Sequence, residues 1–103
     1  MKQLAALELF LGGYLHQDWA DDYPDLWHAV DDFTDGEPQS APHFRADVEH
    51  VLSQCQSDQE IQQRLRQLHI SYYPPGDGWK SYRAWLLAVA AHVEKNLHKS
   101  PAA

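Results

Sequence analysis

Carboxylates are the reactive side chains that stand out in this chain, because nine of them fall between Lys2 and Arg45 with no lysine or arginine among them. They are Glu8, Asp18, Asp21, Asp22, Asp25, Asp31, Asp32, Asp35 and Glu37. Lys2 against nine acids gives residues 1–44 a charge of −8, and residues 45–103 carry +1, so the net charge of −7 belongs to the first half. Because of this segregation the carboxylates repel one another, and together they project a strong negative potential. We expect this surface to bind a basic ligand.

Histidines and aspartates could also hold a metal or act as acid and base, but their spacing does not fit. An EF-hand loop aligned on Gly36 would put Phe33 and Pro42 where ligands are needed. There is no His-Glu-x-x-His run, no paired cysteine, no Gly-x-Ser-x-Gly elbow and no phosphate-binding glycine loop. We therefore expect no catalytic residue, no metal, no cofactor and no enzymatic activity. A metal-dependent enzyme built on His16 and Asp18 is the alternative, and metal analysis of the purified protein would decide it.

The composition also limits what the chain can bind and where it acts. Lysines and arginines do not cluster, which argues against nucleic acid and against an anionic membrane surface as partners. Cys55 is the single cysteine, and its neighbours Val51 and Leu52 predict a small buried hydrophobe. The apolar stretch 4–15 is too short to span a bilayer, and no secretory signal is recognisable. We expect a cytoplasmic protein.

The elements that position these side chains are predicted to be helices. A length of 103 residues fits one domain. Apolar residues recur at helical spacing in about five segments, which are 2–11, 24–35, 41–55, 58–68 and 82–99. Only 70–73 has the composition of a strand, and it has no sheet to join. The prediction is an all-α, single-domain compact bundle over 1–99, with a frayed tail at 100–103.

Several residues predict where these helices begin and end. Gly12-Gly13 is expected to stop the first helix, and Pro24 suits the first position of the second. Ser57 and Glu60 fit a capping box, in which each side chain accepts the other's backbone amide. Ser81 can cap the last helix. Residues 14–23 are expected to be irregular, with continuation of the first helix through residues 14–18 after a kink as the alternative.

Aromatic side chains fall into two groups on this prediction. Tyr14 and Trp27 are most simply core residues. Trp19 and Tyr23 lie in an acidic loop and are better suited to anchor an interface, where such rings bury a large area. A second aromatic segment, 71–80, is expected to form a structured connection with a type II turn at Pro75-Gly76. Its rings could belong to the core or to a contact surface.

Helix position decides which carboxylates need a partner. Asp21, Asp22 and Asp25 fall near a helix start, where negative charge is favourable. Asp31, Asp32 and Asp35 fall near the end of the same helix, where negative charge is unfavourable. The predicted partner-binding residues are Asp18, Trp19, Asp21, Asp22, Tyr23, Asp31, Asp32, Asp35 and Glu37.

Two blocks of sequence together cover about half of the chain. The first is Leu9-Phe10-Leu11-Gly12-Gly13-Tyr14-Leu15-His16-Gln17-Asp18-Trp19, followed by Ala29-Val30-Asp31-Asp32-Phe33. The second is Tyr72-Tyr73-Pro74, Asp77-Gly78 and Ser81-Tyr82-Arg83-Ala84-Trp85-Leu86. In these blocks the chain resembles a family of small immunity proteins of bacterial contact-dependent growth inhibition (CDI).

The resemblance implies a small helical cytosolic protein that binds and neutralises the C-terminal toxin domain of an effector. Such toxins are frequently nucleases, whose basic clefts would complement the carboxylates. The alternative is an acidic adaptor or regulatory domain that binds another cationic protein or peptide, and a neighbouring effector gene would separate the two. A monomer is favoured, although the oligomeric state is open.

Overall fold

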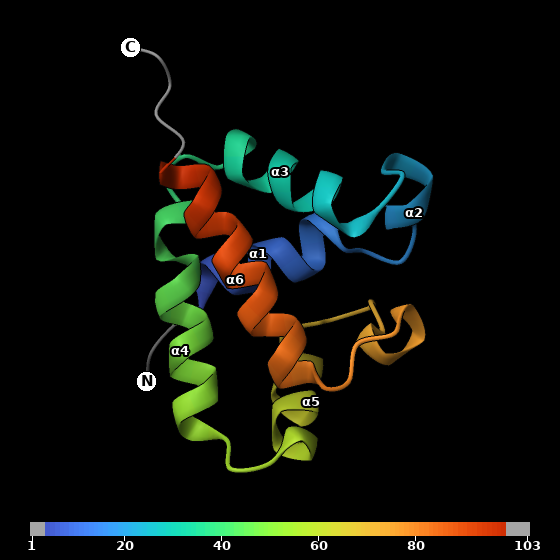
Figure 1. Ribbon diagram of the computed structural model, residues 1–103, viewed down its shortest axis with the longest axis vertical. Coiled ribbons are helices and arrows are strands. Elements are labelled where there is room, and N and C mark those ends of the chain that lie inside the picture. Colours follow the sequence, from blue (N-terminus) through green and yellow to red (C-terminus); the bar gives the residue numbers. More distant parts are fainter. Residues whose placement is uncertain (1–3, 99–103) are drawn as a thin grey trace.

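A computed structural model describes residues 4–98, and helices account for most of them (Figure 1). The elements are α1 (Ala5–Leu9), the π-helical turn η1 (Phe10–Tyr14), α2 (Trp19–Asp22), α3 (Leu26–Gly36), the 3-10 turn η2 (Ala41–His43), α4 (Phe44–Gln54), α5 (Asp58–Gln67), the 3-10 turn η3 (Pro74–Asp77) and α6 (Tyr82–His98). Within residues 4–98 there is no strand. The all-α prediction is confirmed. Lys99 and the predicted tail 100–103 lie outside the described residues.

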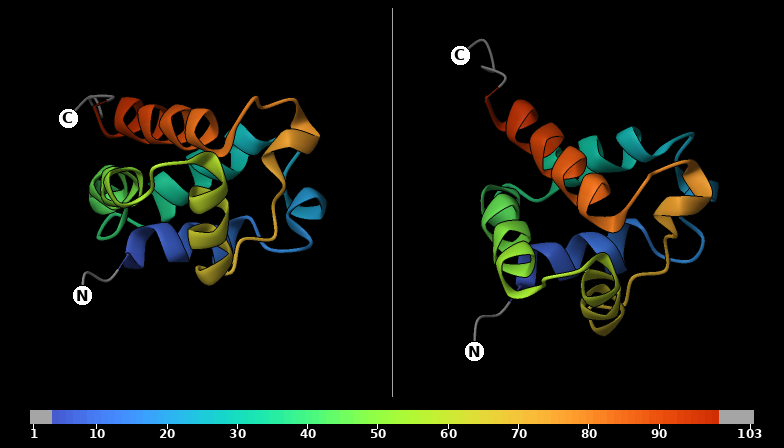
Figure 2. Two further views of the ribbon diagram at one scale, coloured as in Figure 1. Left: turned by 90° about the horizontal axis from the view of Figure 1, so that it is seen from below. Right: turned by 60° about the horizontal axis from the view of Figure 1, so that its bottom comes forward.

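The long helix α6 organises the packing, since it contacts α3, α4 and α5. Helix α4 packs against α6 on one side and α1 on the other (Figure 2). Three phenylalanines meet edge to face at the centre, with ring centroids 5.2 to 5.5 Å apart: Phe10, Phe33 and Phe44. A radius of gyration of 13.1 Å is that of a single compact domain of this length. No helix within 4–98 has the length and apolar character to cross a membrane.

The sequence predicted that the first helix stops at Gly12-Gly13, and this prediction is wrong. The helix continues through both glycines as a π-helical turn, and the Leu15 amide donates to the Phe10 carbonyl at 3.0 Å. Phe10, Leu11 and Leu15 are fully buried, so the core holds this segment in helical form against the glycines' preference. The next residues are also less irregular than expected, because α2 forms one short turn.

Helix α3 begins two residues after Pro24, which corrects the predicted start. Asp25 is the N-cap, and its Oδ1 accepts the His28 amide at 2.9 Å. An aspartate cap satisfies one of the exposed amides of the first turn, which proline could not do. Pro24 lies in the chain that leads into the cap.

The caps of α5 and α6 largely follow the sequence. Ser57 Oγ accepts the Glu60 amide, but the Glu60 carboxylate accepts the amide of Gln56 at 3.0 Å, not that of Ser57. Ser81 Oγ accepts the Ala84 amide at 3.0 Å, which confirms it as a cap. In addition, the Asp58 carboxylate accepts the amides of Tyr82 and Arg83 at 3.1 and 3.0 Å. Asp58 therefore joins the start of α5 to the start of α6.

The connection between α5 and α6 contains η3, and the predicted type II turn at Pro75-Gly76 is wrong. A type II turn needs a positive φ at Gly76, whereas the glycine with a positive φ within 4–98 is Gly78, at 88°. The adjacent prolines fix their own φ near the 3-10 value. Gly78 then ends the turn in the left-handed region.

Asp47 is a buried carboxylate that the sequence analysis did not single out. It is 3% exposed on α4, and its Oδ2 accepts the amides of Ala6 and Leu7 at 3.0 and 3.1 Å. These are orphan donors at the start of α1. Asp47 thus caps one helix from the side of another.

Candidate functional site

The predicted partner-binding residues lie on α2, on α3 and on the chain next to them. Asp18, Asp21, Asp22, Asp32 and Asp35 are exposed, whereas Trp19, Tyr23, Asp31 and Glu37 are partly buried. Trp19 and Tyr23 pack against the core without being enclosed by it, and Tyr14 and Trp27 do the same. The structure therefore does not separate the two predicted aromatic groups. We refer to the nine predicted residues together as the acidic surface.

Part of the acidic surface gathers around two phenols. The Tyr23 hydroxyl donates a hydrogen bond to Asp32 Oδ2. Burial, that hydrogen bond and the Asp32 charge raise the pKa of Tyr23 well above its ordinary value. Burial, followed by the charges of Glu37 and Asp32, likewise raises the pKa of Tyr14. Tyr23, Asp32 and Glu37 are thus brought together, with Tyr14 as an unforeseen neighbour.

His16 organises the chain before α2. Its Nδ1 lies 3.1 Å from the Asp18 amide and its Nε2 lies 3.1 Å from Asp22 Oδ2. An amide can only donate, so Nδ1 accepts and the ring proton is on Nε2, which donates to Asp22. His16 therefore fixes the chain around Asp18 and Asp22, which belong to the acidic surface.

Asp31 faces a different part of the molecule from Asp32. Its Oδ1 lies 2.7 Å from His92 Nε2 and accepts the Asn96 amide at 2.8 Å, and both partners are on α6. Adjacent residues on a helix point about 100° apart, which separates the two aspartates. No partner for Asp31 could be predicted, because nothing in the sequence shows that α6 lies beside α3.

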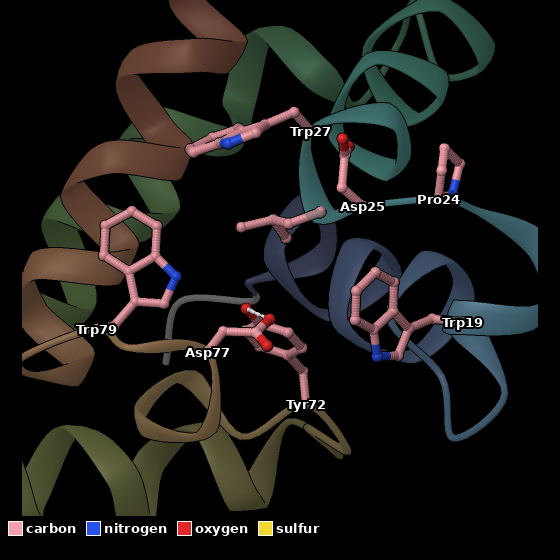
Figure 3. A pocket seen from close by; sticks show the side chains of 8 residues that line it. Trp19, Pro24, Asp25, Trp27, Tyr72, Asp77 and Trp79 are labelled. Atoms are coloured by element: carbon pink, nitrogen blue, oxygen red, sulfur yellow. Dashed lines mark hydrogen bonds between the residues drawn. The ribbon is translucent and has the colours of Figure 1, made fainter.

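An aromatic pocket of about 360 Å³ lies next to the acidic surface (Figure 3). It is lined by Trp19, Pro24, Asp25, Leu26, Trp27, Tyr72, Asp77 and Trp79. Trp19 and Trp79 stand on opposite sides of it, Trp27 closes a third side, and Tyr72 lies across from Trp27. Trp27 and Trp79 meet edge to face at 6.2 Å, and Trp19 meets Tyr72 at 5.4 Å. Three separate segments of the chain, α2, α3 and the connection between α5 and α6, thus supply aromatic walls.

Two carboxylates also line the aromatic pocket. The Tyr72 hydroxyl donates to Asp77 Oδ2, and burial, together with that bond, raises the Tyr72 pKa. The His28 side chain and backbone hydrogen-bond to Asp25 and lower its pKa, so Asp25 is ionised at neutral pH. Only Trp19 of these residues was assigned to partner binding from the sequence. For Tyr72 and Trp79 the prediction left open whether they belong to the core or to a contact surface. No binding role was predicted for Asp77, which stands between aromatic residues in the sequence.

The described residues show little other chemistry. Residues 4–98 contain no group of three histidine, cysteine or acidic side chains placed to hold a metal. Cys55 is buried as predicted, and burial raises the pKa of its thiol, which disfavours the nucleophilic thiolate. A helical scaffold with exposed carboxylates and an open aromatic pocket has the features of a binding protein.

The family model described as CdiI immunity protein matches residues 3–93. No curated protein and no solved structure matches the chain. The chain belongs to the CdiI immunity protein family, and it is therefore an immunity protein of contact-dependent growth inhibition. Membership of this family implies a cognate toxin as the binding partner. The resemblance seen in the sequence is confirmed.

Proposed function

We propose that this immunity protein neutralises the C-terminal toxin domain of its CDI effector by placing the acidic surface against a basic toxin site. The toxin domain is a nuclease in this proposal, and the immunity protein acts in the cytoplasm as an inhibitor without enzymatic activity of its own. A nuclease must attract phosphates, so its cleft carries positive charge. Carboxylates fixed on α2 and α3 can take the place of those phosphates or cover the entrance to the cleft.

The observation that carries the proposal is a set of carboxylates that the fold does not use. The side chains of Asp18, Asp21 and Asp35 are exposed and make no hydrogen bond or ion pair with any residue in 4–98. Asp35 also lies in the last turn of α3, where a negative charge is unfavourable by about 0.3–1 kcal/mol. Charges that repel one another and weaken a helix end are explained by a ligand that neutralises them.

Complementary charge raises the rate at which such an inhibitor associates with its toxin. Electrostatic steering raises protein association rates toward about 10⁸–10⁹ M⁻¹s⁻¹ at low salt, and the advantage shrinks as salt increases. Rapid capture protects a cell that receives an active toxin. Contacts by Trp19 and Tyr23, which are partly exposed beside the carboxylates, would add area and discrimination between toxins.

The test compares two variants with the same change in net charge. Asp21→Asn/Asp35→Asn removes two charges of the acidic surface. Glu49→Gln/Glu94→Gln removes two charges from α4 and α6, where both acids form an ion pair with Arg45. Association with the toxin domain of the neighbouring effector gene is followed by stopped flow at several salt concentrations.

We expect the Asp21/Asp35 variant to associate several-fold more slowly at low salt and to depend less steeply on salt, with the Glu49/Glu94 variant close to wild type. Equal rates for all three proteins would place the contact elsewhere. Incubating the toxin domain with RNA and with DNA, in the absence and presence of the immunity protein, tests its reaction. A toxin that cleaves neither would refute the nuclease part of the proposal.

A further inference from the structure

We propose that the aromatic pocket receives a cationic side chain of the toxin, specifically an arginine, as the anchor of the complex. The inference deepens the proposed function and rests on its basic protein partner. It concerns a different set of residues, because only Trp19 belongs to both the aromatic pocket and the acidic surface.

The walls of the aromatic pocket suit a cation. The faces of indole and phenol rings carry negative potential, and a guanidinium near such a ring is attracted to it. Trp19, Trp27 and Trp79 are each partly exposed, and they surround the opening from three sides (Figure 3). A cation between them would contact more than one ring at once. A volume of about 360 Å³ is enough for a long side chain with its head group.

The charges in the aromatic pocket also favour a cationic ligand. Asp25 and Asp77 line it, and no lysine or arginine within the described residues does. Both carboxylates are exposed, so an incoming guanidinium can reach them and form charge-assisted hydrogen bonds. An apolar side chain in the same place would remove water from the two carboxylates without pairing them. An acidic side chain would be repelled.

Arginine fits better than lysine for geometric reasons. Its guanidinium is planar, stacks on aromatic faces and offers a fork of N–H donors that matches a carboxylate. Lysine presents a compact and more strongly hydrated charge. Rings and carboxylates that line the same pocket are an arrangement that uses both properties of arginine together.

Contacts beneath the aromatic pocket hold its walls in place. The Trp27 ring lies 4.7 Å from the His92 ring, and His92 is bound in turn to Asp31. Tyr72 stacks on the fully buried Trp85 with centroids 5.2 Å apart. A site whose walls are fixed by the core loses little side-chain freedom when a ligand enters.

The first experiment detects the aromatic pocket without the toxin. The peptide acetyl-Gly-Arg-Gly-amide is titrated into the ¹⁵N-labelled protein, and the indole N–H signals of the four tryptophans are followed by NMR. Acetyl-Gly-citrulline-Gly-amide has nearly the same shape without the charge and is the ligand control. We expect saturable shifts for Trp19, Trp27 and Trp79 with the arginine peptide only, whereas buried Trp85 stays unchanged.

The variant Asp25→Asn/Asp77→Asn removes both charges and keeps the contacts. Asparagine is as good an N-cap as aspartate, and its side-chain oxygen can still accept from Tyr72. We expect it to weaken the peptide response about tenfold or more, while Asp21→Asn/Asp35→Asn leaves the response within about twofold. The proposal is overturned if no indole shifts, if citrulline acts like arginine, or if both double variants weaken the response equally.

The second experiment uses the toxin domain and separates the two proposals. Trp79→Leu is expected to lower affinity for the toxin domain by about tenfold or more, as for a central interface anchor. The NMR spectrum and the unfolding free energy of this variant report whether the rest of the fold is kept. Wild-type affinity in Trp79→Leu would refute the aromatic pocket as the anchor and leave the proposed function standing. A wild-type protein that does not bind the toxin domain would refute the proposed function itself.

Discussion

Asp31 of α3 and His92 of α6 lie 61 positions apart in the chain, yet Asp31 Oδ1 is 2.7 Å from His92 Nε2. The His92 ring also contacts Trp27, and the two ring centroids are 4.7 Å apart. The Asp31–His92 pair thus links α3 and α6 to a wall of the aromatic pocket. Asp31 differs in this respect from Asp35 one turn later, which is exposed and has no partner in 4–98.

Replacing Asp31 is therefore expected to affect folding as well as charge. Asp31→Ala should lower the free energy of unfolding by about 1 kcal/mol, because hydrogen bonds to His92 and Asn96 are lost at a half-exposed site. In a double-mutant cycle, Asp31→Ala should cost less when His92→Ala is already present. Asp35→Ala is the control and should not lower the free energy of unfolding, because its charge is unfavourable at the end of α3. Additive effects of Asp31 and His92 would show that the pair does not interact in solution.

Asp47 should be among the most sensitive polar positions of the chain. Asp47→Ala leaves the buried amides of Ala6 and Leu7 without an acceptor, which is expected to cost about 2–3 kcal/mol in chemical denaturation. Asp47→Asn should cost less, since its amide oxygen can still accept. Glu49→Ala, on the exposed side of the same helix, serves as the control. A loss for Asp47→Ala no greater than for Glu49→Ala would contradict the capping role.

His69 is the non-glycine residue with a positive φ in 4–98, at 69°. It follows α5, where its amide bonds to Arg66 and the Ile70 amide bonds back to Leu65. Glycine usually occupies this position, because a Cβ is strained in the left-handed region. His69→Gly should therefore raise the free energy of unfolding by about 0.5–1 kcal/mol. His69→Ala keeps the Cβ and should bring no gain, so an equal gain from both substitutions would point to the imidazole instead.

Alkaline pH should destabilise the fold through its tyrosines. Burial and the hydrogen bond to Asp77 raise the pKa of Tyr72 above the ordinary value of 10.0, so folding favours the neutral phenol. The stability from this effect is complete below pH 10 and is lost as the pH rises toward the folded-state pKa. Denaturation at pH values on both sides of 10 measures it. Tyr72→Phe should reduce the pH dependence, whereas Phe at Tyr73, which is 61% exposed, should retain it.

The sequence predicts the helices of this fold better than their junctions. Apolar spacing located the five longer helical segments, because each needs one buried face. Junction errors came from the core and from competing caps. Burial of Phe10 and Leu15 carries the chain helically through Gly12-Gly13, and the Asp25 cap moves the start of α3 past Pro24. Local preferences of about 1 kcal/mol are outweighed by such contacts.

The candidate site was predictable only where it is continuous in sequence. The acidic surface comes from one segment, so counting charges was enough to propose it, and its role in partner binding stays a prediction. The aromatic pocket joins α2 and α3 to the connection before α6, and no local signal shows that Trp19 meets Tyr72 or that Trp27 meets Trp79. Helical spacing assigns a residue to a face, but it does not say which distant segment lies opposite.

The two hydrogen bonds that the Asp58 carboxylate accepts from backbone amides at the start of α6 have a consequence for recognition. They close the chain between α5 and α6 into a tethered loop, and that loop carries Tyr72, Asp77 and Trp79. In the proposed complex, the shape of the aromatic pocket is therefore set before the toxin binds, and binding does not have to order a flexible segment first. On this proposal the binding site is preorganised. Its selectivity can change through substitutions in a loop whose two ends stay fixed.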